Sequence, residues 1–229
     1  MKKTISRAPD FFHWFQRNYT IIFILLLFLY LFFAFLAPFL MHLGLKTEGK
    51  FIYSIYSNLC HQFAHRSWFL FGEQSYYPVT VFDHQDIKSL YDMFGIKAGD
   101  LQGTRQVIGN ETAGYKVAIC QRDVMIYFFL MLFGMIFYYS QNKIKKIPLW
   151  LWFLFAIFPL GFDGLWQFLS TINLFNIPNH ESTPLIRSIT GALFGFFSGW
   201  YLLPAIQDTF DDEANGTLAK SVKSVNGKR

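Results

Sequence analysis

Four long apolar runs dominate the 229-residue sequence. They cover residues 20–43, 124–140, 147–170 and 186–206. A helix needs about 20 apolar residues to cross a bilayer, so each run predicts a membrane-spanning helix. The first run is longer than the apolar core of a cleaved signal peptide, which has about 7–15 residues. The sequence therefore predicts an all-α integral membrane protein with four transmembrane helices.

The fourth run carries glycines at a regular four-residue spacing. Small residues spaced in this way form a flat stripe on one face of a helix, and a neighbouring helix can approach such a stripe closely. We therefore expect the fourth helix to pack tightly against another one through Gly191, Gly195 and Gly199.

The charged residues lie mainly at the ends of the apolar runs, so the net charge of +5 does not indicate a nucleic-acid partner. Lysine and arginine are enriched on the cytoplasmic side of transmembrane helices. The basic N-terminus and the KIKK loop at residues 143–146 both fit this rule. The pattern predicts a protein of the plasma or inner membrane with both termini in the cytoplasm.

This topology divides the chain into three parts. Residues 1–19 are expected to form a cytoplasmic segment, and residues 20–206 a four-helix membrane domain with an external cap insertion at about 73–116. Residues 207–229 are polar and mixed in charge, which predicts a disordered cytoplasmic tail.

The external region begins with a segment of helical periodicity. Phe51, Ile55, Leu59 and Phe63 recur every four residues, which predicts an amphipathic helix on the outer membrane surface. Further along, YYPVTVFD predicts a short strand and IKSLYDMFG a short helix that ends at Gly95. We therefore expect the cap to be small and mixed in structure.

Polar residues of four segments reach the outer membrane surface at one depth in this topology. They are Cys60, His61, Gln62, His65, Arg66, Cys120, Arg122, Asp123, Asp163, Trp166, Gln167, Arg187 and Thr190. A charged residue within a membrane span costs about 2.5–3.5 kcal/mol on insertion scales. Asp163 is therefore expected to face the bundle interior with a partner. Arg187 is the first candidate for that partner, and Arg122 is the second.

Two motifs carry a family resemblance. Residues 60–67 read Cys-His-Gln-x3-Arg-Ser, and residues 120–127 read Cys-x-Arg-Asp-x2-Ile-Tyr. With the later motifs that begin at Asp163 and Arg187, the chain resembles a family of small bacterial and archaeal membrane proteins catalogued as domain of unknown function 2085. The resemblance covers roughly residues 50–72 and 117–205. It implies a membrane protein with a shared polar site and implies no activity.

This sequence departs from the family pattern in two places. Met125 stands where family members have glycine, and the cap is an insertion between the two cysteine motifs.

The two cysteines allow several kinds of chemistry. Cys60 and Cys120, on an oxidising outer face, are able to form a disulfide. Together with His61 they provide ligands suited to zinc, or less well to copper, with His65 as an alternative to His61 and Asp123 as a possible fourth ligand. Redox thiol chemistry is less expected because the chain has no Cys-x-x-Cys pair. A histidine pair on a surface helix is also compatible with plain exposure to solvent.

The charged residues at the same site also have two interpretations. Arg122, Asp123, Asp163 and Arg187 alternate in sign, as in an ion-pair network that only orients helices. Arginine also matches phosphate and carboxylate groups through its planar fork of donors. Arginines at headgroup level, such as Arg66, frequently extend to the membrane surface.

These observations favour a membrane enzyme that acts at the outer face on a lipid or another anionic amphiphile. Cys60, His61 and Cys120 are the expected metal ligands, and Asp163, Asp123 and Arg187 are the expected catalytic groups. The residues expected to bind the substrate are Arg66, Arg122, Trp166, Gln167, Thr190 and Gln62. Metal-assisted hydrolysis or group transfer fits this set. A non-enzymatic membrane protein with a Cys60–Cys120 disulfide and a small ion or solute transporter are the alternatives.

Overall fold

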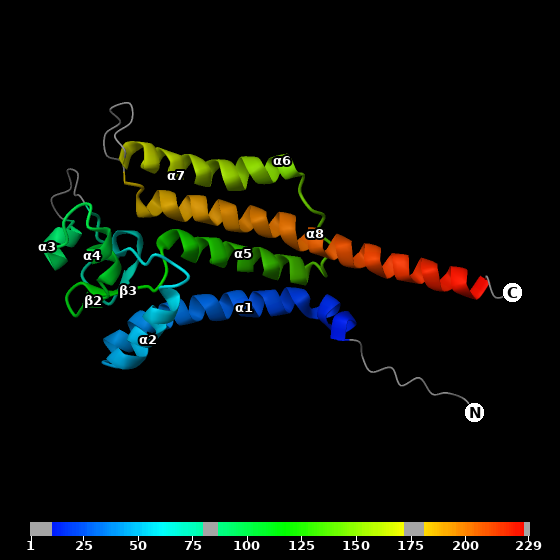
Figure 1. The fold of residues 1–229 in the computed structure, drawn as a ribbon, viewed down its shortest axis with the longest axis horizontal. Coiled ribbons are helices and arrows are strands. Elements are labelled where there is room, and N and C mark those ends of the chain that lie inside the picture. Colours follow the sequence, from blue (N-terminus) through cyan, green and yellow to red (C-terminus); the bar gives the residue numbers. More distant parts are fainter. Residues whose placement is uncertain (1–10, 80–86, 172–180, 227–229) are drawn as a thin grey trace.

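The computed structural model describes residues 11–79, 87–171 and 181–226. Its core is a bundle of long helices that run side by side (Figure 1). These are α1 (Phe11–His42), α5 (Gln121–Tyr139), the continuous rod α6 (Leu149–Trp152), η2 (Phe153–Ile157) and α7 (Phe158–Thr171), and α8 (Pro184–Asn226). Four helices in the described part of the chain are long and apolar enough to cross a membrane. The predicted class, an all-α protein with four membrane helices, is confirmed.

The outer surface of the bundle explains why these helices belong in lipid. On α1, Leu25, Leu26 and Phe28 each leave about half of their surface uncovered, at 54%, 61% and 50%. A water-soluble protein buries such side chains against other elements. The bundle instead presents them to its surroundings, and acyl chains cover them without the cost of hydrating them.

The glycine stripe of α8 packs against α5, as expected. A Cβ added to Gly191 would lie 2.5 Å from the backbone oxygen of Arg122. A Cβ on Gly195 would overlap the backbone of Ile126, and one on Gly199 would lie 3.0 Å from the Cβ of Phe133. Glycine is therefore required along this face for the two helices to approach closely.

A small cap covers one end of the bundle (Figure 1). Its elements are α2 (Lys46–Tyr56), η1 (Ala64–Arg66), β1 (Phe69–Leu70), α3 (Leu90–Phe94), α4 (Leu101–Gln106), β2 (Gly109–Asn110) and β3 (Gly114–Lys116). The strands form an antiparallel sheet in the order β1-β3-β2, with Phe69 opposite Lys116. The central strand β3 ends shortly before α5 begins, so the sheet lies next to the start of α5 in the chain.

Part of the expected cap is confirmed and part is wrong. Helix α3 forms where predicted, with a capping box at Ser89 and a left-handed Gly95 at its end. The amphipathic helix does not reach Phe63, because α2 ends at Tyr56 and Gln62 adopts a positive φ of 54°. Within YYPVTVFD, residues 76–79 form no strand, and the remainder lies outside the described residues.

The end of the bundle opposite the cap holds the start of α1 and the connection from α5 to α6, and α8 projects beyond it (Figure 1). The charge pattern predicts that this end is cytoplasmic, and the assignment stays a prediction. In the structure α8 continues as a helix to Asn226, so the segment expected to be a disordered tail is helical over its described part. Its hydrophobic run therefore extends into a polar helix instead of stopping at the membrane surface.

Candidate functional site

Four consecutive positions at the start of α5 contact three different sets of partners. Cys120 is the N-cap, and its Sγ accepts a hydrogen bond of 3.4 Å from the backbone N–H of Asp123. Successive residues of a helix point about 100° apart, because 3.6 residues complete one turn. Cys120 and Asp123 therefore lie on one side of the helix, whereas Gln121 and Arg122 project in other directions, and the first turn of α5 joins the cap to the other helices.

Cys60, Cys120 and Asp123 form the cluster that resembles a metal site, called here the thiol–carboxylate cluster. Their Sγ and carboxylate oxygen atoms all lie within 4.8 Å of one another. Cys60 reaches this place because α2 ends one turn earlier, and the Cys60 N–H still bonds to the Tyr56 carbonyl at 2.9 Å. Both cysteines are free thiols, and all three residues are half-buried.

The two thiols are hydrogen-bonded to each other, and this makes them electrostatically unequal. The hydrogen bond from Cys120 lowers the pKa of the Cys60 thiol below its ordinary value. The same hydrogen bond, followed by burial, raises the pKa of Cys120. The pair is therefore expected to lose its two protons in separate steps.

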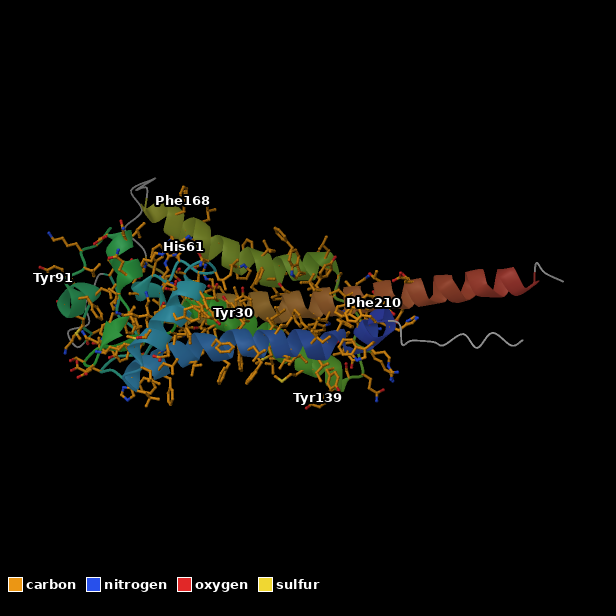
Figure 2. The ribbon with its side chains drawn as sticks, turned by 60° about the horizontal axis from the view of Figure 1, so that its bottom comes forward. Tyr30, His61, Tyr91, Tyr139, Phe168 and Phe210 are labelled. Carbon is orange, nitrogen blue, oxygen red and sulfur yellow. The ribbon has the colours of Figure 1, made fainter. Side chains whose placement is uncertain are left out.

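His61 is not part of this cluster in the described structure, and its expected part in a metal site stays a prediction. Its ring is exposed and stacks on Phe63 with centroids 5.5 Å apart. Figure 2 shows His61 at the cap end of the bundle, far from Tyr139 at the other end. His61 follows Cys60 in the irregular chain between α2 and η1, and the structure does not bring its ring to the other two ligands.

His65 is buried, and burial lowers the pKa of its imidazole to about 3. It is therefore neutral at ordinary pH. Its Nδ1 atom has no hydrogen-bond partner in the structure as described. His61 and His65 do not share a helix face, because helix η1 begins only at Ala64.

The partner of Asp163 is Arg122, not Arg187. Arg122 Nη2 forms an ion pair with Asp163 Oδ2, and Gln167 Nε2 donates to the same oxygen at 2.9 Å. Asp163 retains only 6% of its exposed surface, so it faces the interior as expected. Sequence reasoning expected Asp163 to have an arginine partner, which the structure confirms, but chose the wrong arginine as the first candidate.

Arg187 belongs to a second polar contact, between α8 and the cap. Its guanidinium donates to the His65 carbonyl at 2.8 Å and to the Gln121 side chain at 3.5 Å, and it pairs with Glu181 at 3.5 Å. Glu181 also accepts the backbone N–H of Val79 at 3.3 Å, and burial raises its pKa. Sequence reasoning missed Glu181, although it is the only charged residue in its loop.

The other residues expected to bind substrate make contacts elsewhere. Arg66 is exposed and lies over Phe63, with its guanidinium carbon 5.6 Å from the ring centroid. Trp166 stacks on a neighbour of its own helix, and Thr190 donates to the Ile186 carbonyl of its own helix at 2.9 Å. Gln62 is buried and donates to a backbone carbonyl of α2. The structure therefore separates the single expected site into the thiol–carboxylate cluster and ion pairs on other sides of α5.

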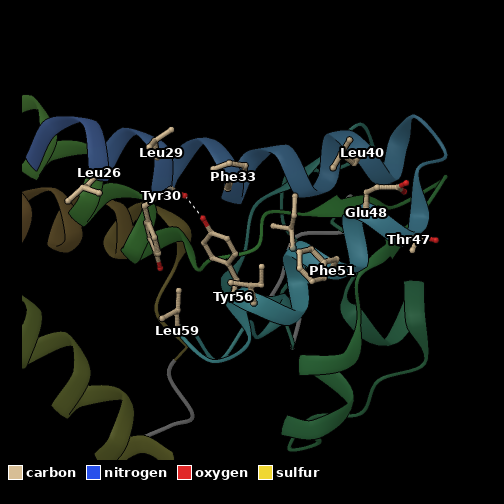
Figure 3. Close-up of a pocket in the computed structure, with 12 residues that line it drawn as sticks. Leu26, Leu29, Tyr30, Phe33, Leu40, Thr47, Glu48, Phe51, Tyr56 and Leu59 are labelled. Carbon is tan, nitrogen blue, oxygen red and sulfur yellow. Dashed lines mark hydrogen bonds between the residues drawn. The ribbon is translucent and has the colours of Figure 1, made fainter. Parts of the chain in front are cut away.

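An apolar groove between α1 and α2 adjoins the cluster. It has a volume of about 780 Å³ and is almost entirely apolar in lining. The residues that line it are Leu26, Leu29, Tyr30, Phe33, Leu40, Thr47, Glu48, Phe51, Ile52, Ile55, Tyr56 and Leu59 (Figure 3).

Two tyrosines connect this groove to the cluster. The Tyr56 hydroxyl donates to the Tyr30 carbonyl at 2.5 Å, as Figure 3 shows. The Tyr30 ring meets the Tyr127 ring edge-on at 4.6 Å. Tyr127 follows Asp123 by one helical turn on α5, and Asp123 belongs to the cluster. The sequence signal for Tyr127 was the Ile-Tyr end of the second motif, whereas nothing in the first apolar run distinguished Tyr30.

Comparison with known proteins agrees with the membrane architecture. The model of a family described as "Predicted membrane protein (DUF2085)" matches residues 111–201, so the resemblance drawn from the motifs is confirmed over this part. The uncharacterized protein MJ1492 of Methanocaldococcus jannaschii is 29% identical over 196 residues, which is 82% of this chain and 92% of that protein. No solved structure matches the chain.

Proposed function

We propose that this chain, whose residues 111–201 match a family of predicted membrane proteins, is a metal-dependent membrane enzyme that acts on an anionic amphiphile. One observation carries the proposal. Cys60, Cys120 and Asp123 converge within 4.8 Å at one end of the bundle, beside a groove fitted to an apolar chain. By the charge pattern, that end is the outer face of the membrane.

The chemistry of the three side chains suits zinc. Two thiolates and one carboxylate are standard zinc ligands, and a catalytic zinc site keeps three protein ligands and an open position for water. Copper fits less well because the soft thiolates are joined here by a hard carboxylate. The lowered pKa of Cys60 supports binding, since a metal ion takes up thiolate and not thiol.

The groove supports an amphiphilic substrate. Its lining would accept the apolar chain of a lipid, and Tyr30 and Tyr56 would mark the end nearest the metal. A water bound to zinc has its pKa lowered to about 7, which makes hydroxide available near neutral pH for hydrolysis or group transfer. The substrate's polar linkage would then lie at the thiol–carboxylate cluster, with its chain along α1.

Asp163 and Arg187 take positioning roles in this proposal. Both were expected to be catalytic, but both are engaged in buried ion pairs. Arg122–Asp163 would hold α7 against α5, and Arg187 would hold the cap against α8. Asp123 remains the acidic residue in contact with the proposed metal.

Metal analysis of the purified protein tests the proposal. We expect about one zinc ion per chain in protein purified without chelator in neutral detergent. A Cys60→Ser Cys120→Ser variant is expected to lose it, while the matched control His61→Ala keeps it. Equal zinc in wild type and the double cysteine variant would contradict the proposed site.

The second candidate function is a non-enzymatic membrane protein in which Cys60 and Cys120 form a disulfide. The contact between the two thiols favours it. Thiol labelling of denatured, non-reduced protein separates the two candidates. Two titratable thiols per chain support the metal site, and none supports the disulfide.

A further inference from the structure

A second hollow lies against a different face of α2 and shares none of its lining residues with the apolar groove. It has a volume of about 730 Å³ and lies between α2, the turn after it and α4. Its lining residues are Lys50, Tyr53, Ser54, Ser57, Gln62, Phe63, Leu101, Gln102, Arg105, Gln106 and Ile108. We call it the α2–α4 hollow.

The lining of the α2–α4 hollow combines apolar side chains with polar ones and carries two positive charges. Lys50 and Arg105 contribute two cations, three glutamines contribute amides, and two serines contribute hydroxyls, whereas no carboxylate is among the lining residues. Arginine and lysine bind anions through charge-assisted hydrogen bonds, and amides bind hydroxyl groups as donor and acceptor. The lining therefore suits a ligand that carries both a negative charge and several hydroxyls.

A buried lysine without a carboxylate partner among the described residues lies behind this hollow. Lys116 is fully buried, and its Nζ donates to the carbonyls of Gln62 at 2.6 Å and Arg105 at 2.8 Å. Both of these residues line the hollow. In the part of the chain that the structure describes, no carboxylate forms an ion pair with Lys116. Burial lowers its pKa to about 7, as expected for a cation without a counter-ion.

Hydrogen bonds hold the wall of the hollow in place before any ligand arrives. The Tyr53 hydroxyl donates to the Lys116 carbonyl, and the Gln62 side chain donates to the Tyr53 carbonyl at 3.0 Å. Arg105 donates to the Ser57 carbonyl at 2.8 Å, which ties α4 to the end of α2. A preformed site loses less entropy on binding than a mobile one.

We infer that the α2–α4 hollow binds a phosphate ester of a polyol, as in a glycerophosphate headgroup. The phosphate would meet Lys50 and Arg105 and supply the negative charge that Lys116 lacks, and the hydroxyls would meet the glutamine amides. Phe51 on α2 and Leu59 just after it are 67% and 61% exposed, so an apolar surface that suits lipid lies close to the hollow. This inference does not depend on the proposed metal, because no lining residue belongs to the thiol–carboxylate cluster.

Calorimetric titration of the full-length protein in an uncharged maltoside detergent tests the inference. The probes are glycerol 3-phosphate, inorganic phosphate and glycerol, and a fourth arm uses nanodiscs with or without phosphatidylglycerol. We expect glycerol 3-phosphate to bind more tightly than phosphate, and glycerol not to bind. Tighter binding of phosphatidylglycerol would identify a lipid as the source of the headgroup. Tighter binding of glycerol 3-phosphate would identify a soluble ester.

Variants locate the binding in the hollow. Lys50→Gln and Arg105→Gln are each expected to weaken binding about tenfold, as for the loss of one charge-assisted hydrogen bond. Lys97→Gln is the matched control, because Lys97 is an exposed cap lysine that does not line the hollow. Lys50 lies on an exposed surface, so its replacement tests the site without disturbing the buried core.

Two results would overturn the inference. The first is that neither glycerol 3-phosphate nor phosphatidylglycerol binds to the wild type. The second is that the wild type, Lys50→Gln and Lys97→Gln bind with equal affinity. The proposed zinc ligands do not line the hollow, so either result leaves the proposed metal site unaffected.

Discussion

Replacing Asp163 with alanine should destabilise the protein strongly. Asp163 is 6% exposed and is paired with Arg122, whose side chain is 22% exposed. Removing one partner of a buried ion pair costs about 3–5 kcal/mol, because it leaves an uncompensated charge. Water reaches part of Arg122, so we expect the lower end of that range. For a chain of this length about 3 kcal/mol corresponds to a fall of roughly 6–12 °C in Tm.

A double-mutant cycle followed by thermal unfolding in detergent measures the ion pair itself. We expect the double variant Asp163→Ala Arg122→Ala to lose clearly less unfolding free energy than the two single variants lose together. The reason is that the double variant leaves no unpaired charge. The matched control is Asp208→Ala, which breaks the exposed pair with Lys146. That pair is open to solvent, so its loss should leave Tm within experimental error.

The cycle has a clear negative outcome. An unchanged Tm in Asp163→Ala, or single-variant effects that add without coupling, would show that the pair does not hold α7 to α5. A loss of enzymatic activity with unchanged stability would return Asp163 to the catalytic role expected from the sequence.

Three further predictions concern packing, titration and thiol reactivity. Gly195→Val should lower Tm by several degrees because its side chain would overlap the α5 backbone, whereas Gly161→Val should not, since a Cβ at Gly161 meets open space. The folded-state pKa of Lys116, about 7, lies below the unfolded value of about 10.4, so the unfolded chain binds more protons between these pH values. Unfolding free energy should therefore rise from pH 7 to 10 by on the order of 4 kcal/mol from this group, and Lys116→Met should flatten that rise in denaturant titrations. In metal-free protein, iodoacetamide should modify Cys60 before Cys120 by peptide mass mapping, and the reverse order would contradict the unequal pKa values of the pair.

The membrane architecture could be predicted from the sequence because its cause is local. Long apolar runs need lipid around them wherever they lie, and a glycine stripe permits close packing whichever helix lies opposite. The depth of polar residues followed from the same runs. Asp163, Arg122 and Arg187 all lie toward the cap end of their helices, as the topology predicted.

Direction around each helix could not be predicted in this way. Whether Arg122 or Arg187 meets Asp163 depends on the rotation of three helices about their axes, which the apolar runs leave undetermined. In the structure, the contact of Gly191 and Gly195 with α5 fixes the rotation of α8 relative to α5.

The end of α2 depends on residues distant in sequence. The apolar stripe from Phe51 to Phe63 predicts a continuing helix, yet Gln62 has a left-handed backbone conformation. Lys116, 54 positions later, holds the Gln62 carbonyl, and Cys120 lies against Cys60. Tertiary contacts of this kind override a local pattern.

X-ray absorption at the zinc edge tests the central proposal most directly. We expect zinc-loaded wild type to show two sulfur ligands at about 2.3 Å and lighter ligands at about 2.0–2.2 Å, from Asp123 and a bound water. Asp123→Ala should keep both sulfurs and change only the lighter ligands. A zinc environment without sulfur would contradict the assignment of Cys60 and Cys120 as metal ligands.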